Sequence, residues 1–149
     1  MKFVSQVEDI LVRHANIKES DVTRTEIRLG KIDYRIVGHS AGGSTIKRLG
    51  ITGDLCRLNP SVVVWSDSSY GSWLDLAWKG CLKEHGILTK VFVQKWGAPY
   101  RSTMRFINEL GKVPKKIELN IMLRPWVHKT IGDNVVKLSN LLGDKDETN

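Results

Sequence analysis

The sequence predicts an α/β fold, a three-layer sandwich in which a mostly parallel sheet lies between helices. Short runs of strand-forming residues alternate with longer segments whose apolar residues recur at helical spacing, an order typical of parallel strands joined by crossover helices. The run Val62-Val63-Val64 is apolar and β-branched throughout, which indicates a strand buried on both faces. The length of 149 residues is sufficient for one such domain with a substantial core.

The composition is that of an ordinary globular protein, with 41% hydrophobic and 26% charged residues. We expect a single domain over residues 1–142 and a polar C-terminal tail over 143–149. The formal net charge is +7, and the basic residues are dispersed, the densest group being Lys112, Lys115 and Lys116. This charge favours anionic partners. Nucleic-acid binding is the less favoured interpretation, because basicity alone argues for non-specific attraction.

Two cysteines, Cys56 and Cys81, give neither a disulfide framework nor the spacing of a metal site, so we interpret them as buried thiols. The N-terminal segment reaches Glu8 too early for a signal peptide, and no apolar run approaches the length of a membrane span. A cytoplasmic location is therefore the expectation.

The N-terminal third predicts two helices and two strands. Apolar residues recur at helical spacing over 3–15, which predicts an amphipathic helix, and they alternate with charged residues over 23–29, which predicts an edge strand. A short strand at 34–37 and a helix at 43–49 follow. We interpret residues 50–60 as a connector, because they end in an asparagine–proline turn signal.

Beyond residue 60, strands and helices alternate. Runs of β-branched and aromatic residues predict the strands, and stripes of apolar residues three and four positions apart predict the helices. The expected strands are 61–67, 88–94 and 117–123, and the expected helices are 70–82, 97–110 and 131–142.

The segment Gly38-His39-Ser40-Ala41-Gly42 has the pattern G-x-S-x-G between an expected strand and an expected helix. Such a turn holds the serine in a strained conformation and lifts its hydroxyl clear of the sheet, and the flanking glycines avoid collisions with neighbouring backbone. The helix N-terminus presents free N–H groups to a developing oxyanion, and Ala41 supplies the first candidate donor. So short a pattern also occurs by chance, and the order of elements around it gives it weight.

Three reactive side chains, Ser40, Asp67 and His128, follow the carboxyl ends of expected strands. The carboxyl ends of parallel strands meet at one edge of a sheet, so we expect these residues to lie together. His128 can take the serine proton and return it to the leaving group, because histidine changes charge near neutral pH. Asp67 can fix the tautomer of His128 and stabilise its imidazolium form.

The segment from Gly38 to Gly43 resembles the nucleophile elbow of α/β-hydrolase-fold esterases and lipases. Together with Asp67 and His128, it is similar to small serine hydrolases of bacteria and their phages. The resemblance implies that Ser40 is the nucleophile and His128 the triad histidine. Few residues precede the elbow, and the loop that supplies the second oxyanion donor in this family has no identifiable counterpart.

The acid of the triad is open to more than one assignment. In most members of the family it follows the second strand after the elbow strand, where this chain has residues 94–97 and no carboxylate. Asp67 follows the first such strand, as in some lipases of the fold, and we prefer it over Asp75 and Asp133. Asp75 is expected on a solvated helix face, and Asp133 near the last helix is the reserve acid.

The other histidines have structural interpretations. His39 is adjacent to Ser40, but neighbours on a tight turn point apart, so it is the less favoured base. His85 is expected at an exposed helix end.

Aromatic and basic residues near the strand ends are candidates for substrate binding, namely Tyr70, Trp96 and Arg101. We therefore predict a serine hydrolase that cleaves a small-molecule or polymeric ester, thioester or amide through an acyl-enzyme, with no metal or organic cofactor. One alternative is a catalytically degenerate protein on the same scaffold that binds an anionic small ligand or nucleic acid. Another is a purely structural partner subunit.

Overall fold

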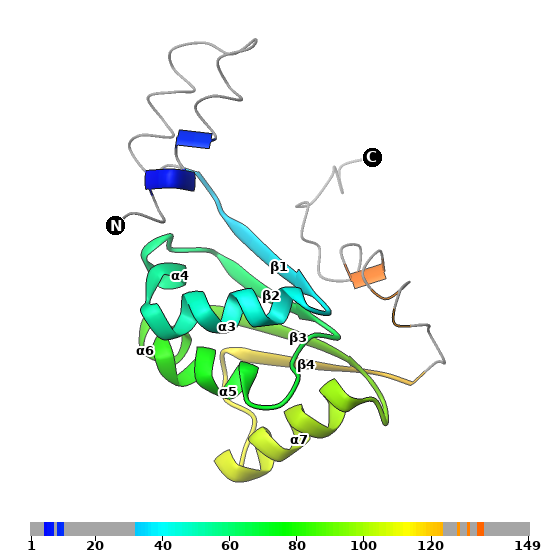
Figure 1. Ribbon diagram of the computed structural model, residues 1–149. Coiled ribbons are helices and arrows are strands. Elements are labelled where there is room, and N and C mark those ends of the chain that lie inside the picture. Colours follow the sequence, from blue (N-terminus) through cyan, green and yellow to red (C-terminus); the bar gives the residue numbers. More distant parts are fainter. Residues whose placement is uncertain are drawn as a thin grey trace, which may run out of the picture.

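The computed structural model describes residues 5–7, 9–10, 32–123, 128, 131 and 134–135. Within them, four parallel strands form one sheet in the order β1-β2-β3-β4, with helices between successive strands (Figure 1). The α/β class and the parallel sheet are confirmed. Because the strands follow one another in chain order, right-handed crossovers place the intervening helices on one face of the sheet.

The expected strands after residue 60 agree with the observed ones to within one residue. The strands are β1 (Arg35–His39), β2 (Val62–Ser66), β3 (Leu88–Gln94) and β4 (Ile117–Met122). The helices are α3 (Gly42–Thr52), α4 (Asp54–Arg57), α5 (Trp73–Ala77), the π-helix η1 (Trp78–Leu82), α6 (Lys83–His85) and α7 (Ala98–Leu110).

The interpretation of residues 50–60 as a connector is wrong. Helix α3 continues through Gly50 to Thr52, and a second short helix, α4, follows it. A Cβ on Gly50 would lie 2.8 Å from the Cα of Ala77, so this glycine allows α3 to pack closely on α5. Gly53, with a φ of 82°, ends α3 in the left-handed conformation that glycine adopts readily.

Several expectations fall wholly or partly outside the described residues. Residues 5–7 and 9–10 are helical, and they are the described part of the expected helix at 3–15. The expected edge strand at 23–29 and the tail at 143–149 lie outside the described residues. Of the expected helix at 131–142, residues 131 and 134–135 are described and are helical.

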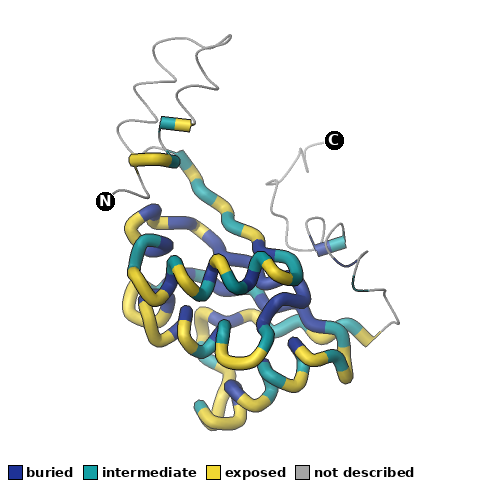
Figure 2. The backbone as a smooth tube through the Cα atoms, viewed as in Figure 1, coloured by how far each residue is buried: buried dark blue, intermediate teal, exposed yellow. Residues whose placement is uncertain are grey.

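Apolar side chains are buried on both faces of the sheet. All five residues of β2 are buried, as expected for a central strand, and Figure 2 shows this buried backbone between the more exposed helices and β1. Val63 and Trp65 pack with apolar residues of α3, α5 and α7. The alternate residues Val62 and Val64 pack with Ile131 and other apolar residues on the opposite face. The sheet is therefore held rigidly at its centre, where the strand ends carry the candidate site.

Cys56 and Cys81 form a disulfide between α4 and η1, with their Cα atoms 6.1 Å apart. The interpretation of these residues as free buried thiols is therefore wrong, although both side chains are buried. Structural disulfides are uncommon in the cytosol, so this bond is unusual for a protein of the expected cytoplasmic location. No helix in the described part of the chain is long and apolar enough to cross a bilayer.

Candidate active site

Ser40 directly follows β1 and has a φ of 53°, in the left-handed region that non-glycine residues rarely adopt. Its N–H donates to the carbonyl of Ser66 at the end of β2 (3.3 Å), and its own carbonyl accepts the N–H of Gly43 (3.1 Å). The left-handed backbone conformation costs a residue other than glycine about 1–2 kcal/mol of conformational free energy. The strand-to-helix turn therefore has the strained serine that the G-x-S-x-G pattern predicts.

The glycines around Ser40 do not all have the predicted role. A Cβ on Gly38 would lie 2.5 Å from the Cδ1 of Ile46, and one on Gly43 would lie 2.1 Å from the backbone oxygen of Ser68. A Cβ on Gly42 would meet no atom within 4 Å. The steric requirement after the serine therefore falls on Gly43, outside the five-residue pattern, and not on Gly42.

Asp67 directly follows β2, is buried, and also has a positive φ, of 46°. Its N–H donates to the carbonyl of Phe92 (2.8 Å), which ties the turn to β3. Its Oδ1 accepts the N–H of Gln94 (3.3 Å), and its Oδ2 accepts the Nδ1–H of His128 (2.6 Å). Both carboxylate oxygens are thus hydrogen-bonded, as a buried carboxylate requires.

Backbone strain is concentrated at the carboxyl edge of the sheet. Among the described residues, four non-glycine residues have a positive φ, and three of them follow β1, β2 and β3 in turn: Ser40, Asp67 and Trp96. Strained residues of this kind persist where the surrounding structure holds them, and they cluster at functional sites. This edge is therefore the candidate active site.

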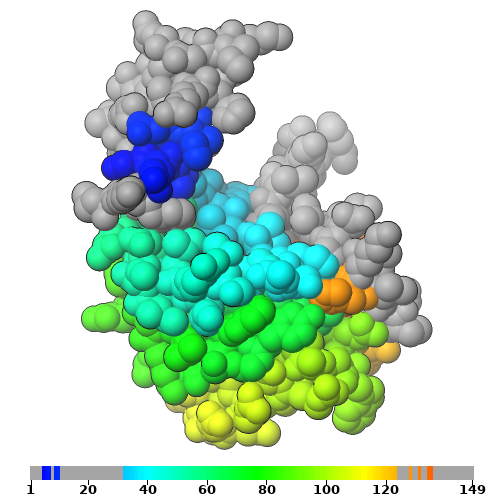
Figure 3. Space-filling view, viewed as in Figure 1, coloured from blue at the N-terminus to red at the C-terminus, as the bar shows by residue number. Residues whose placement is uncertain are grey.

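His128 lies at the same edge, 61 residues beyond Asp67 in the chain. Its ring stacks on that of His39, with centroids 4.8 Å apart and an angle of 27° between the planes. In Figure 3 the described residues near the C-terminus (orange) lie against the end of β1 and the start of α3 (cyan). The bond to Asp67 uses Nδ1, which leaves Nε2 as the ring nitrogen available to a reacting group.

The structure thus joins Asp67 to His128 directly, and the residues next to Ser40 and Asp67 connect Ser40 to the same edge of the sheet. Within the described residues, no hydrogen bond links Ser40 Oγ to His128. Two contacts made by neighbouring residues place Ser40 instead. Its own N–H donates to the carbonyl of Ser66, which precedes Asp67 in the chain. The ring of His39, which precedes Ser40, stacks on the ring of His128. In unliganded enzymes, catalytic hydrogen bonds are often long and tighten when substrate binds.

Ala41, the predicted oxyanion donor, is the N-cap of α3. No acceptor within the described part of the chain takes its N–H. A free N–H at a helix N-terminus is suited to a developing negative charge. The second donor, which the sequence did not locate, is not identified among the described residues either.

The alternative acids and bases occupy other environments. Asp75 lies on α5 and forms an ion pair with Lys79, one helical turn away (3.0 Å); its side chain is half-buried, so the expectation of a solvated helix face is wrong. His85 is exposed at the end of α6, as expected, with its Nδ1 3.0 Å from the carbonyl of Cys81. Asp133, the reserve acid, lies outside the described residues.

The three predicted substrate-binding residues differ in their availability. Trp96 is 69% exposed, with the ammonium of Lys95 4.9 Å from its ring centroid and the ring of Tyr100 packed edge-on at 5.8 Å. Arg101 is exposed and donates to the carbonyl of Trp96. Tyr70 is half-buried and packs edge-on against Trp73 (5.4 Å). Trp96, with two cations beside it, is therefore the most accessible of the three.

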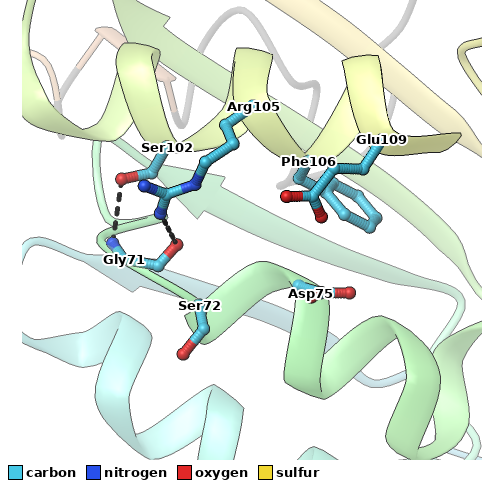
Figure 4. Close-up of a pocket in the computed structure, with 7 residues that line it drawn as sticks. All are labelled: Gly71, Ser72, Asp75, Ser102, Arg105, Phe106 and Glu109. Atoms are coloured by element: carbon cyan, nitrogen blue, oxygen red, sulfur yellow. Dashed lines mark hydrogen bonds between the residues drawn. The ribbon is translucent and has the colours of Figure 1, made fainter. Parts of the chain in front are cut away.

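A separate pocket of about 160 Å³ lies between the turn after β2 and α7 (Figure 4). Two hydrogen bonds cross it: the N–H of Gly71 donates to Ser102 Oγ (2.9 Å), and Arg105 donates to the Gly71 carbonyl (3.5 Å). None of the predicted site residues lines it. The residues that line it are Gly71, Ser72, Asp75, Ser102, Arg105, Phe106 and Glu109. We interpret these contacts as anchoring the turn that carries Asp67.

Sequence reasoning missed two features of this site. It set His39 aside, although the ring contacts His128, and it gave no role to the serines around Asp67. Ser66 and Ser68 are fully buried, and Ser68 Oγ donates to the carbonyl of Gly38 (2.8 Å), which ties the two turns together. The signal was a run of polar residues, 66–69, that begins at the end of an otherwise apolar strand.

Among the described residues, no group of three or more histidine, cysteine, aspartate or glutamate side chains could hold a metal ion. Comparison of the chain with protein-family models, with curated proteins and with solved structures finds no match. No family is therefore identified, and the function has to be argued from the geometry at the carboxyl edge of the sheet.

Proposed function

We propose that this protein is a serine hydrolase of the α/β-hydrolase type, acting on an ester, thioester or amide. The observation that carries the proposal is the 2.6 Å hydrogen bond between Asp67 and His128 at the edge where Ser40 is held with a positive φ. A buried carboxylate on Nδ1 fixes the histidine tautomer in which Nε2 can accept a proton. This is the arrangement that a serine nucleophile requires.

In the proposed reaction, Ser40 Oγ attacks the carbonyl carbon of the substrate while His128 Nε2 takes the hydroxyl proton. The oxyanion that forms is stabilised by the N–H of Ala41 at the start of α3. His128 then gives the proton to the leaving group as the bond to that group breaks, which yields an acyl-serine. Water, deprotonated by His128, attacks the acyl carbon; the bond from that carbon to Ser40 Oγ then breaks, and His128 returns the proton to Oγ, which releases the acid and the free serine.

Asp67 contributes through burial as well as charge. Asp67 is only 4% exposed, so its carboxylate is largely shielded from solvent and interacts more strongly with the imidazolium that forms in each step. The N–H of Gln94 holds the second oxygen, which keeps the carboxylate oriented toward His128. Asp67 is therefore proposed as the orienting acid, and Asp75, which pairs with Lys79, is not.

The position of Trp96 defines the proposed substrate. Strands of a sheet are about 4.8 Å apart, so the end of β3 lies roughly 10 Å from the end of β1 that carries Ser40. A substrate that spans this distance can place an apolar group on the exposed indole and an anionic group near Lys95 or Arg101. We therefore propose an acyl substrate that is apolar at its far end and negatively charged.

An active-site-directed fluorophosphonate tests the proposal. The folded wild-type protein should be labelled at Ser40, and Ser40→Ala should abolish labelling because the phosphorus atom then has no nucleophile to react with. Ser44→Ala is the matched control, since Ser44 lies one turn further along α3, and it should be labelled like the wild type. Absence of labelling in well-folded wild-type protein would contradict the proposal and favour a binding protein on this scaffold.

A further inference from the structure

His39 makes two contacts that the proposed reaction does not use. Its Nδ1 lies 3.0 Å from the carbonyl oxygen and 3.1 Å from the Oγ of Ser66, and its ring stacks on that of His128. The imidazole of His39, the last residue of β1, thus contacts both Ser66, the last residue of β2, and His128, the proposed catalytic base.

The partners of the two imidazoles indicate where their protons lie. A carbonyl oxygen only accepts hydrogen bonds, so Nδ1 of His39 carries a proton and donates it to Ser66. Nδ1 of His128 likewise donates to the carboxylate of Asp67. In the neutral form each ring therefore has its lone pair on Nε2, and His128 keeps this nitrogen free for proton transfer.

A single hydrogen bond does not fix the plane of a ring. An imidazole held only at Nδ1 can still rotate about its Cβ–Cγ bond, which would take Nδ1 off Asp67 part of the time and carry Nε2 away from the serine. A flat neighbour stacked on the ring face removes this freedom. His39 is a firm support because its own Nδ1 is anchored to Ser66, which is fully buried in the central strand β2.

We infer that His39 is a positioning residue that holds the ring of His128 in the plane where Nδ1 stays on Asp67 and Nε2 is presented at the edge carrying Ser40. The consequence for catalysis rests on the proposed hydrolase function, whereas the effect on the His128 ring does not. His39 contributes two features, a flat ring that stacks on His128 and a hydrogen bond from that ring to Ser66, and substitutions can remove them separately.

Three variants separate them. His39→Phe keeps a flat ring and loses the donor to Ser66. His39→Asn keeps a polar group near the position of Nδ1 and loses the ring. His39→Ala loses both. If stacking positions His128, the alanine and asparagine variants should behave alike, and the phenylalanine variant should retain part of the wild-type behaviour.

The first measurement is independent of catalysis. Two-bond ¹H–¹⁵N correlation spectra of the full ¹⁵N-labelled chain report which ring nitrogen of each histidine carries the proton, and His128→Gln assigns the His128 signals. We expect the Nδ1–H form for His128 in the wild type, averaging between tautomers in His39→Ala and His39→Asn, and substantial retention of the Nδ1–H form in His39→Phe.

The second measurement is the rate of labelling by the fluorophosphonate. Misplacement of a catalytic group by about 1 Å can cost 10²-fold in rate, so labelling of the alanine and asparagine variants should fall by roughly 10-fold or more. The phenylalanine variant should be labelled at a rate between these and the wild type.

Unchanged His128 spectra in both the alanine and asparagine variants overturn the inference, even if labelling slows, because His39 would then act otherwise than through His128. If the wild type is not labelled at all, the hydrolase proposal fails while the spectra still decide the positioning role. If His39→Ala does not fold, as judged by circular dichroism, the comparison of His39→Phe with His39→Asn decides the question.

Discussion

Substituting alanine at each of two adjacent glycines tests the packing that positions Ser40. In Gly43→Ala the new methyl group would lie 2.1 Å from the backbone oxygen of Ser68, far inside any ordinary contact. That oxygen cannot move easily, because Ser68 is fully buried and its Oγ is hydrogen-bonded to the Gly38 carbonyl. Strain therefore has to be taken up by the turn that carries both Asp67 and Ser68.

The magnitude follows from two opposing effects. Overpacking of a buried site costs typically 1–3 kcal/mol, and a collision with backbone places Gly43→Ala at the upper end, about 3 kcal/mol. Replacing glycine by alanine in a helix returns about 0.5–1 kcal/mol. The free energy of unfolding should therefore fall by about 2 kcal/mol. Gly42→Ala meets no atom within 4 Å, so it should leave the protein as stable as the wild type or up to about 1 kcal/mol more stable.

Urea unfolding followed by tryptophan fluorescence measures both changes. With a slope of about 1–3 kcal/mol per molar urea, a loss of 2 kcal/mol lowers the midpoint by roughly 1 M. Labelling of Gly43→Ala by a fluorophosphonate should also slow, because the strained turn carries Asp67. Equal stability of the two variants, or a greater loss in Gly42→Ala, would refute the conclusion that Gly43 is the sterically required glycine.

Three further predictions concern the acid, the substrate and the disulfide. Asp67→Asn should slow fluorophosphonate labelling by about 10³-fold or more, since an amide no longer enforces the tautomer of His128, whereas Asp75→Asn should not change the rate. Trp96→Ala should raise KM for an apolar, anionic ester by roughly 10-fold with kcat unchanged, and thermal unfolding should show little effect because the side chain is 69% exposed. Reduction of the Cys56–Cys81 bond, which closes a loop of sequence separation 25, should lower the free energy of unfolding by about 3.5 kcal/mol in urea titrations, and the double alanine variant should not respond to reductant.

Much of the fold could be predicted because most helices and strands have a recognisable pattern of apolar residues in their own local sequence. The β-branched run of β2 indicates a strand buried on both faces, and the apolar stripe of α7 indicates a helix with one buried face. The observed bounds of both elements agree closely with the expected ones. The connector at 50–60 was predicted wrongly for a non-local reason. Gly50 and Gly53 resemble loop residues in sequence, but Gly50 lies in α3 because its missing side chain allows contact with Ala77.

The candidate site was predictable to the extent that topology determined it. Parallel strands have their carboxyl ends at one edge, so residues that follow adjacent strands are neighbours whatever the length of chain between them. This argument places Ser40 and Asp67 at adjacent strand ends. The pairing of Asp67 with His128 was predicted from the chemistry of the two groups instead, because β3 separates β2 from β4 in the sheet. It could not rank Gly42 against Gly43, because the difference between them is a collision with Ser68 from another turn.

The sequence by itself determined the parallel α/β architecture and the edge of the sheet at which Ser40 and Asp67 lie, since both depend on periodicity and on the direction of consecutive strands. Only the tertiary structure decided that Cys56 pairs with Cys81 and that His39 lies against His128. Those pairings depend on how closely separate elements approach and on which way their side chains turn. Spacing along a chain carries no record of either, because distances across a packed interior are set by the side chains that fill it.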